Sequence, residues 1–544
     1  ADGGEQRTIA PTVPGADKLA PTSKAPASNK DERDCVIQKL MDRLPAELAD
    51  EQRSATRQLL QKYDDIFSTN EFDVGRTPLV EYHIDTGASR PIRQALRRQP
   101  LKHLEAIDEN VKAMLEHGII EPAASPWASN VVIVAKKDGS LRFCVDYRAV
   151  NSVTYRDAYP LPLIDNCLNA MHGAAWFSTL DLRAGYHNIP VAEVDRDKTA
   201  FITRRGCWRY TVMPFGLTCA PSVFQRLMDM VLAGLSYETC LVYLDDIVIF
   251  SETFQQHLER LEAVFARLRW ARLKLKPSKC NLLQRRVAFL GHVISEEGVS
   301  MQTEKIDAVQ NWPQPRSVRD VRSFLGICSY YRRFIAGFAD TAAPLHALTG
   351  KGVPFSWGAG QQNAFETLKE KLITAPILVM PSNDGQYLLD TDASDIGLGA
   401  VLSQIQDDKE CVIAYASRTL SKPEKNYETT RKELLAVVYG LKQFRQYLLG
   451  QPFVIRTDHS ALSWLRRTPE PLPQLARWLT FIEQFDYTIL HRPGRKHGNA
   501  DSLSRRREPD QFDEHDVIGA VPMERAGAGS DVVDQSAGEL ADWF

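Results

Sequence analysis

Two adjacent aspartates stand inside an apolar stretch of this sequence. The segment "LVYLDDIVIF", from Leu241 to Phe250, carries Asp245 and Asp246 between two runs that favour the arms of a β-hairpin. Neighbouring carboxylates repel in a low-dielectric site, and one is normally driven neutral unless a divalent cation binds both. An exposed turn with two solvated acids is the other interpretation, because aspartate is a common turn residue. The segment alone leaves both open.

A third acid favours the metal site. The segment "WFSTLDLRAGYHNIPV" places Asp181 at the end of another apolar strand, directly before a turn. Three carboxylates that converge from two strands can hold two Mg²⁺ ions, which activate an attacking oxygen and stabilise a leaving one in phosphoryl transfer. Because Mg²⁺ usually takes one or two protein carboxylates together with substrate phosphates, the arrangement suits nucleotidyl transfer better than a structural metal cage.

Four further acids follow in the order strand, helix, strand, helix. They are Asp392 in "YLLDTDAS", Glu433 in "KELLAVVYGL", Asp458 in "FVIRTDHS" and Asp501 in "ADSLSRR". Three of them also have a purely structural interpretation. Glu433 can complete a capping box with Thr430, Asp458 can cap a helix, and Asp501 can favour a helix start.

The bulk composition limits the class of protein. A length of 544 residues favours three or four domains, and a hydrophobic content of 44% is enough for real cores. The net charge of −3 neither requires nor excludes a nucleic-acid partner. The 9 cysteines contain no C-x-x-C pair, which favours a reducing compartment over a disulfide framework. We expect no membrane association and no signal peptide, because no stretch has the required pattern.

Local patterns supply the elements that position the acids. A turn at Asp138–Gly139 between two apolar runs predicts a hairpin over "SNVVIVAKKDGSLRFCVDY". The run "TFQQHLERLEAVFARLRWARL" has the spacing of an amphipathic helix. A basic and aromatic helical region follows between Ser317 and Leu348, and a second αβ unit begins near Gln386.

One motif points to a different enzyme class. The segment "HIDTGAS", from His83 to Ser89, contains the Asp-Thr-Gly-Ala core of an aspartic protease site. Such a protease needs two copies, each followed by an apolar strand. This copy is single and precedes a polar segment with a proline. We therefore interpret it as a loop.

The motifs around the first three acids resemble the polymerase of reverse transcriptases, most closely those of gypsy-like LTR retrotransposons. The resemblance rests on "YLDD" in an apolar hairpin, preceded by "LDLRAGYHNIPV" and "TVMPFGLTCAPSVFQ". It extends through "FLGHVISEEGV" and "WPQPRSVRDVRSFLGICSYYRRFI", from about Pro91 to Arg507. It implies that Asp181, Asp245 and Asp246 are the catalytic, metal-binding acids.

The same resemblance implies nucleotide and nucleic-acid contacts. Tyr186 matches an aromatic residue that checks the incoming sugar, although a core tyrosine fits the sequence too. Phe215, in "MPFG", stands where retroviral enzymes usually have glutamine, so their fine selectivity does not transfer. The other implied nucleotide contacts are Lys136, Lys137, Arg142 and Lys279, the last matching a lysine proposed to protonate the leaving pyrophosphate. Tyr330, Tyr331, Arg332 and Arg333 would meet a duplex in the thumb, and a plain amphipathic helix is the alternative.

The later acids resemble the four-carboxylate site of ribonuclease H, and "TDAS" and "RTDHSAL" are close to gypsy-like forms. The resemblance implies that Asp392, Glu433, Asp458 and Asp501 bind two Mg²⁺ and cleave RNA in an RNA–DNA hybrid. His491, ten residues before Asp501, matches an auxiliary histidine of cellular relatives. A plain strand-end histidine is the alternative.

We therefore expect a multidomain α/β (α+β) protein, with a right-hand polymerase of fingers, palm and thumb followed by a ribonuclease H-like domain. The expected segments are a disordered start (1–35), an inter-domain region (36–90), fingers and palm (91–297), thumb (298–352), a linker (353–384), the ribonuclease H-like domain (385–507) and a disordered acidic tail (508–544).

The implied function is RNA- and DNA-directed DNA synthesis with degradation of the copied RNA. The expected cofactor is Mg²⁺, two per site, with Mn²⁺ as a substitute. The expected partners are an RNA template, a DNA primer, RNA–DNA hybrid and deoxynucleoside triphosphates, in cytoplasmic virus-like particles. Two alternatives remain: a domesticated fragment that binds nucleic acid without catalysis, and a structural subunit that supports a catalytic partner.

Overall fold

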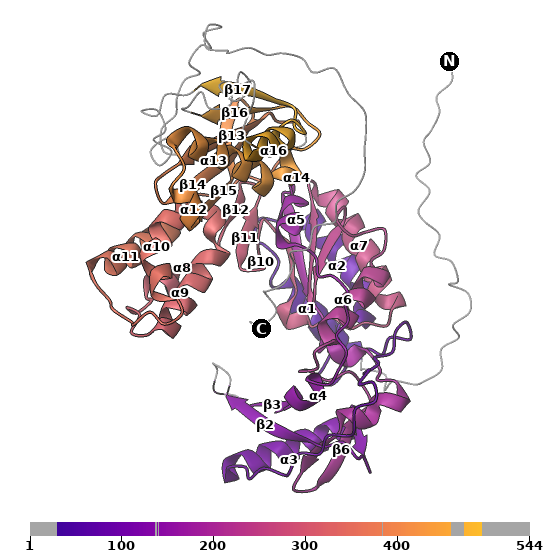
Figure 1. The fold of residues 1–544 in the computed structure, drawn as a ribbon. Coiled ribbons are helices and arrows are strands. Elements are labelled where there is room, and N and C mark those ends of the chain that lie inside the picture. The colour runs from indigo at the N-terminus through magenta and orange to yellow at the C-terminus, as the bar shows by residue number, and fades with distance from the viewer. Residues whose placement is uncertain (1–29, 136–138, 140, 383, 458–472, 492–544) are drawn as a thin grey trace, which may run out of the picture. The chain divides into compact units, whose positions relative to one another are not determined.

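The computed structural model describes residues 30–135, 139, 141–382, 384–457 and 473–491. These residues form two units, which divide between Phe289 and Leu290 (Figure 1). The described helices include none with the length and apolar character that a membrane-spanning segment requires. The predicted tail, 508–544, lies outside the described residues.

The first unit mixes helices with two sheets. Its elements are α1 (Lys30–Met41), α2 (Asp50–Lys62), η1 (Asp64–Ile66), α3 (Leu101–Glu116), β1 (Ile120–Pro122), β2 (Ser129–Ala135), β3 (Leu141–Val145), α4 (Arg148–Asn151), α5 (Ile164–Asn169), β4 (Trp176–Asp181), η2 (Gly185–Asn188), η3 (Glu193–Thr199), β5 (Phe201–Thr203), β6 (Gly206–Tyr210), α6 (Ala220–Val231), β7 (Cys240–Tyr243), β8 (Asp246–Ser251), α7 (Phe254–Trp270), η4 (Pro277–Lys279), β9 (Asn281–Gln284) and β10 (Arg286–Phe289).

The palm sheet carries the three acids of the first set. Its strand order is β7-β8-β4-β9, and the β4–β8 and β7–β8 pairs are antiparallel. The segments "FSTL" and "IVIF" are buried except for the half-buried Thr179, in agreement with their central position in the sheet. The helix α6 begins with a proline in its first turn and buries Val223, Phe224 and Leu227 on one face.

The fingers sheet has the order β1-β6-β5-β2-β3. The predicted hairpin is present as the antiparallel pair β2–β3, with Ala135 opposite Leu141. Figure 1 shows α3 beside this sheet, at the end of the unit away from α6 and α7. The motif "HIDTGAS" forms a loop, as predicted, in which Gly87 N donates to Asp85 Oδ1 at 2.9 Å.

The segment predicted to separate domains, 36–90, is part of the hydrophobic core of the first unit instead. Its side chains Leu40, Leu60, Phe67 and Tyr82 are almost fully buried in the same cluster as the palm residues. The predicted disorder is also wrong at residues 30–35, because α1 begins at Lys30. Apolar positions at helical spacing on α1 and α2 provide the buried surface.

The second unit contains a helical part and a sheet part. Its elements are β11 (His292–Ser295), β12 (Gly298–Met301), α8 (Thr303–Gln310), α9 (Val318–Tyr330), η5 (Arg332–Phe334), α10 (Phe338–Leu348), α11 (Ala359–Ile373), β13 (Tyr387–Ala393), β14 (Gly397–Gln406), β15 (Lys409–Thr419), α12 (Lys422–Lys425), α13 (Thr429–Gln443), α14 (Arg445–Leu448), β16 (Phe453–Thr457), α16 (Pro473–Ile482) and β17 (Tyr487–His491).

The predicted linker over 353–384 is wrong at its centre, because α11 occupies residues 359–373. This helix buries Ala364, Phe365, Leu368 and Leu372 and packs against α8 and α10. The apolar residues recur at a spacing of three or four, so the sequence does carry the periodicity of a packed helix.

The later sheet has the order β15-β14-β13-β16-β17. The β13–β14 and β14–β15 pairs are antiparallel, whereas β13–β16 and β16–β17 are parallel. The helix α13 packs on β13 and β14. Gly440 permits this close approach, because a Cβ there would lie 3.3 Å from Ala400, Leu389 and Thr391 side chains.

Candidate active sites

The "YLDD" segment forms the predicted hairpin. Tyr243 at the end of β7 pairs with Asp246 at the start of β8, which leaves Leu244 and Asp245 in a two-residue turn. Leu244 has a φ of 54°, a left-handed conformation that is strained for a side chain of this kind. Asp181, the last residue of β4, lies directly opposite Asp246 in the β4–β8 register. The sheet therefore brings Asp181, Asp245 and Asp246 together at one end of its central strands.

The two hairpin acids differ in their exposure to solvent, because Asp245 is half-buried whereas Asp246 is exposed. Burial, and then the charges of Asp181 and Asp246, raise the pKa of Asp245 to about 6. Burial and Asp181 also raise the pKa of Asp246. The Oδ1 atom of Asp245 is buried and has no hydrogen-bond partner among the described residues. Burial and the neighbouring acids thus outweigh the charge of Lys279 at Asp245, as expected of an acid that receives a cation.

A glycine makes room for Asp245. A Cβ at Gly185 would stand 2.9 Å from Asp245 Oδ1 and 3.1 Å from the Phe224 ring. Any side chain at this position would push the carboxylate or the ring away. The small residue in "RAGY" is therefore required by the geometry of the neighbouring hairpin.

Lys279 supplies the nearest positive charge. Its Nζ lies 2.8 Å from Asp181 Oδ2, and this hydrogen bond raises the pKa of the lysine. Among the described residues, no group of three or more His, Cys, Asp or Glu forms a closed set of metal ligands. The carboxylate oxygens, including the buried Oδ1 of Asp245, nevertheless fit Mg²⁺, which needs few protein ligands when phosphates complete its shell.

A group of aromatic rings lies between the three acids and strand β3, which carries Arg142. The Tyr186 ring lies 5.0 Å from the Phe215 ring and 5.5 Å from the Phe224 ring, measured between centroids. Burial and the charge of Asp245 raise the pKa of Tyr186. The Arg142 guanidinium lies over the exposed Phe215 ring at 5.8 Å. Three of the predicted nucleotide contacts are thus neighbours, whereas Lys136 and Lys137 lie outside the described residues.

A buried glutamine that the sequence reasoning missed holds the strained turn. Gln225, on α6, is fully buried, and its side-chain oxygen accepts from Leu244 N at 2.9 Å. Its amide nitrogen donates to Val242 O at 3.3 Å and to Asp229 Oδ1 at 3.0 Å. The signal was present in "SVFQRLM", because a polar residue stands on the apolar face of an amphipathic helix.

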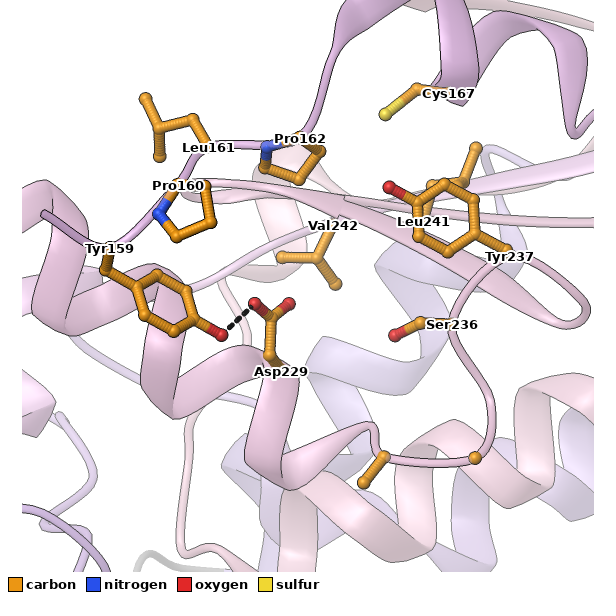
Figure 2. Close-up of a pocket in the computed structure, with 12 residues that line it drawn as sticks. Tyr159, Pro160, Leu161, Pro162, Cys167, Asp229, Ser236, Tyr237, Leu241 and Val242 are labelled. Carbon is orange, nitrogen blue, oxygen red and sulfur yellow. Dashed lines mark hydrogen bonds between the residues drawn. The ribbon is translucent and has the colours of Figure 1, made fainter. Parts of the chain in front are cut away.

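The same hydrogen-bond chain reaches a cavity of about 340 Å³ behind the hairpin (Figure 2). Tyr159 and Asp229 line it together with Leu241 and Val242, and Tyr159 donates to Asp229 Oδ2 at 2.6 Å. The cavity wall and the "YLDD" turn are therefore connected through Asp229 and Gln225.

The thumb residues differ in what they can contact. Tyr331 is 2% exposed, and its hydroxyl donates to Gly291 O at 2.7 Å. The prediction that Tyr331 contacts nucleic acid is therefore wrong, because its ring is buried. Tyr330 is 45% exposed, although its hydroxyl donates to Leu290 O at 2.6 Å. Arg332 is exposed, whereas Arg333 is half-buried and donates to Ile413 O of β15 at 3.5 Å.

Two of the four later acids are described. Asp392 is exposed near the end of β13, and Glu433 is 4% exposed on α13, which packs on that strand. The capping-box interpretation of Glu433 is wrong, because α13 already begins at Thr429. Asp458 and Asp501 lie outside the described residues. His491 ends β17 and pairs with Thr457 of β16.

Buried charges fix the register beside Asp392. Arg456, on β16, binds both carboxylate oxygens of Asp390, its partner in the parallel β13–β16 pair. Its Nη1 also donates to Glu410 Oε2 at 2.8 Å. Lys432 binds Asp395 at 2.8 Å, which ties the residue before Glu433 to the turn after β13. These pairs hold the strand and the helix that carry the described acids.

Comparison with known proteins identifies two domains in this chain. Residues 134–294 match the family described as "Reverse transcriptase (RNA-dependent DNA polymerase)", and residues 357–455 match "RNase H-like domain found in reverse transcriptase". The chain therefore contains a reverse transcriptase domain and a ribonuclease H-like domain, and it is similar to Pol polyproteins of LTR retrotransposons. The second match begins inside the predicted linker, in agreement with the packed helix α11.

The similar proteins include transposon polyproteins of a fly and a yeast. The chain is 38% identical over 435 residues to the "Retrovirus-related Pol polyprotein from transposon 297" of Drosophila melanogaster, covering 79% of this chain and 41% of that protein. It is 38% identical over 421 residues to the "Transposon Tf2-3 polyprotein" of Schizosaccharomyces pombe, covering 76% and 32%. The chain thus spans less than half the length of these relatives.

A solved structure has the same fold. The foamy viral protease-reverse transcriptase in complex with dsDNA has a TM-score of 0.77 and 25% sequence identity. The match covers 88% of this chain and 99% of that one. The expected order of a reverse transcriptase domain followed by a ribonuclease H-like domain is confirmed.

Proposed function

We propose that this reverse transcriptase chain synthesises DNA on RNA and DNA templates and degrades RNA in RNA–DNA hybrids, at two separate sites. The single observation that carries the polymerase proposal is the meeting of Asp181, Asp245 and Asp246 at one end of the β4 and β8 strands, where burial and the neighbouring acids raise the pKa of Asp245. The nucleic-acid partner is supported by the similarity to a viral enzyme bound to dsDNA.

The polymerase site would hold Mg²⁺ through the carboxylates of Asp181, Asp245 and Asp246. When bound, the ions neutralise charge and activate the attacking oxygen of a primer end. Lys279 holds a proton at Nζ beside Asp181, where it can be given to the leaving pyrophosphate. Arg142, with Lys136 and Lys137, would bind the triphosphate of the nucleotide, and Phe215 would face the new base pair.

Tyr186 would act as the sugar check. Its ring is held between Phe215 and Phe224 and lies near enough to Asp245 for that charge to raise its pKa. A rigid ring at this position excludes a 2′-hydroxyl by steric conflict rather than by weaker attraction. Deoxynucleotides would therefore be selected over ribonucleotides.

The nuclease site would use Asp392, Glu433, Asp458 and Asp501 to hold a second pair of Mg²⁺ ions. The described part supports this through the buried Glu433 on a helix that packs on the strand of Asp392. An ionised carboxylate as buried as that of Glu433 is costly, and a bound cation would relieve this cost. His491 would assist product release.

A primer-extension assay on an RNA template tests the proposal. We expect deoxynucleotide incorporation in Mg²⁺, none in EDTA, and partial recovery in Mn²⁺. A matched assay with labelled RNA in a hybrid should show cleavage under the same metal requirement. Binding of primer-template without incorporation in any metal would instead support the non-catalytic alternative.

A further inference from the structure

The segment before the matched reverse transcriptase range packs around the polymerase site. We define the brace as residues 43–77, which lie outside the matched range of 134–294. We propose that the brace positions the polymerase site, and that Arg43 acts as a positioning residue through Lys279. The proposal rests on the proposed polymerase function and assigns part of it to a region that the matched family does not cover.

The first contact is a backbone ladder. Ser68 N donates to Leu275 O at 2.9 Å, and Leu275 N donates to Ile66 O at 2.7 Å. On the other side of the same segment, Lys276 N donates to Asp181 O at 2.8 Å. Residues 274–276 are therefore held between the brace and the end of the strand that carries Asp181.

Side chains of Lys274 and of the preceding helix α7 reinforce this ladder. Lys274 Nζ donates to Asp65 O at 2.8 Å and lies 3.3 Å from Asp73 Oδ1. Arg269, at the end of α7, binds the carboxylate of Asp65. The brace therefore contacts this segment through backbone and charge together, over about two hundred residues of chain separation.

Arg43 is the residue of the brace that contacts the two residues before Lys279. Its guanidinium donates to Ser278 O at 2.9 Å and also to Pro277 O. These two residues and Lys279 form the short helix η4, whose backbone places the lysine. Lys279 Nζ in turn reaches Asp181 Oδ2 at 2.8 Å. One bidentate arginine thus fixes the backbone of the loop that aims the lysine at a catalytic acid.

A second contact reaches the other side of Asp181. Asn188 is fully buried and donates to Arg183 O at 2.9 Å and Gly185 O at 3.1 Å, which shapes the turn before Tyr186. Its side-chain oxygen accepts from Gly75 N of the brace at 2.8 Å. A Cβ on Gly75 would lie 1.9 Å from Arg272 O, so only glycine permits this approach.

These contacts explain why the brace should affect chemistry and not folding alone. Arg43 is exposed, so its removal leaves no buried group unsatisfied and costs little stability. A small displacement of a positioned group near the reacting atoms, by contrast, lowers the rate strongly. The effect of Arg43 should therefore appear in kcat and depend on the presence of Lys279.

The experiment is a double-mutant cycle on the full chain. We expect Arg43→Ala to lower kcat for single-nucleotide addition by about tenfold with little change in KM. In a Lys279→Ala background the same change should have almost no further effect, because the residue it positions is gone. The matched control is Arg267→Ala on α7, outside the brace, because the Arg267 guanidinium also donates to a backbone carbonyl, that of Ala233. Hybrid-RNA cleavage should stay unchanged in every variant.

Three results would overturn the proposal. The first is a wild-type kcat for Arg43→Ala. The second is an equal loss of kcat on Arg43→Ala in the wild-type and Lys279→Ala backgrounds. The third is a wild-type kcat for Lys279→Ala. If Arg43→Ala fails to fold, Arg43→Lys replaces it, because lysine keeps the charge but cannot bind both carbonyls. An Asp181→Asn variant that still extends primers would instead refute the polymerase assignment itself, so the two failures are distinguishable.

Discussion

Tyr186 carries the most specific prediction at the scale of single residues. Its ring is packed on two sides by Phe215 and Phe224, so it cannot move away from a larger sugar. We expect Tyr186→Val to raise ribonucleotide incorporation relative to deoxynucleotide incorporation by about tenfold or more, roughly 1.4 kcal/mol of lost discrimination. The measurement is kcat/KM for each sugar in single-nucleotide addition.

Tyr186→Phe is the matched control, because it keeps the ring and removes only the hydroxyl. It should retain nearly the wild-type sugar ratio. If Tyr186→Val changes both rates equally and leaves the ratio within twofold, the tyrosine is a packing residue and the sugar check lies elsewhere.

Asp245 gives a prediction about pH. Its pKa is raised from 3.8 to about 6 in the folded state, so the folded protein binds the proton more tightly than the unfolded one. Stability is therefore lost as the pH rises from about 4 to 6. In EDTA, Asp245→Asn should stabilise the protein by about 1–2 kcal/mol above pH 6, less than the full shift implies because partial exposure screens the charge.

Urea unfolding of the two proteins at pH 4 and pH 7.5 measures this difference. The gain should be much smaller at pH 4, where the folded wild type holds the proton and the unfolded state is about half protonated. Mg²⁺ at pH 7.5 should raise the stability of the wild type more than that of Asp245→Asn. A gain that is the same at both pH values would contradict the electrostatic origin.

The β7–β8 hairpin shows how one element depends on another. Gln225 on α6 satisfies two backbone groups of a turn in which Leu244 has a φ of 54°. We expect Gln225→Ala to lower kcat of polymerisation by about tenfold or more, because the strained turn loses its support. Stability should fall by about 1–3 kcal/mol.

Gln255→Ala is the control for this change, since Gln255 is an exposed glutamine that donates to Glu259. Primer-extension kinetics and thermal unfolding measure both effects. If Gln225→Ala loses stability but keeps the wild-type kcat, the glutamine supports the fold without positioning the acids.

The short helix η5 carries two arginines with different surroundings. Arg332 is exposed, whereas Arg333 donates to Ile413 O of the ribonuclease H-like sheet. Arg332→Ala should therefore flatten the salt dependence of primer-template binding by about 0.9 units of log–log slope, and Arg333→Ala should not. Equal changes of slope in the two variants would show that both arginines meet phosphates.

At the scale of the whole molecule, the two candidate sites lie in different units. We expect Asp181→Asn to abolish DNA synthesis while hybrid-RNA cleavage continues, and Glu433→Gln to do the reverse. Both assays on each purified variant, with circular dichroism as the check of folding, measure this. Loss of both activities in one folded variant would contradict the two-site arrangement.

The sequence by itself determined the acids and the local elements that carry them. Asp245 and Asp246 stand between two β-prone runs, and Asp181 ends a third, so pattern alone predicted the strands and the turn that the structure contains. These features depend on neighbours within a few residues, which is the range over which propensity and alternation act. The same holds for the β2–β3 hairpin.

Tertiary structure alone decided the features that join distant parts of the chain. Examples are the space that Gly185 leaves for Asp245, the support that Gln225 gives to Leu244, and the burial of Tyr331. Arg43 and Ser278 are 235 residues apart, so no local pattern links them. The prediction that residues 36–90 separate domains was wrong for the same reason. An amphipathic helix shows that one of its faces is buried, but it does not show which surface covers that face.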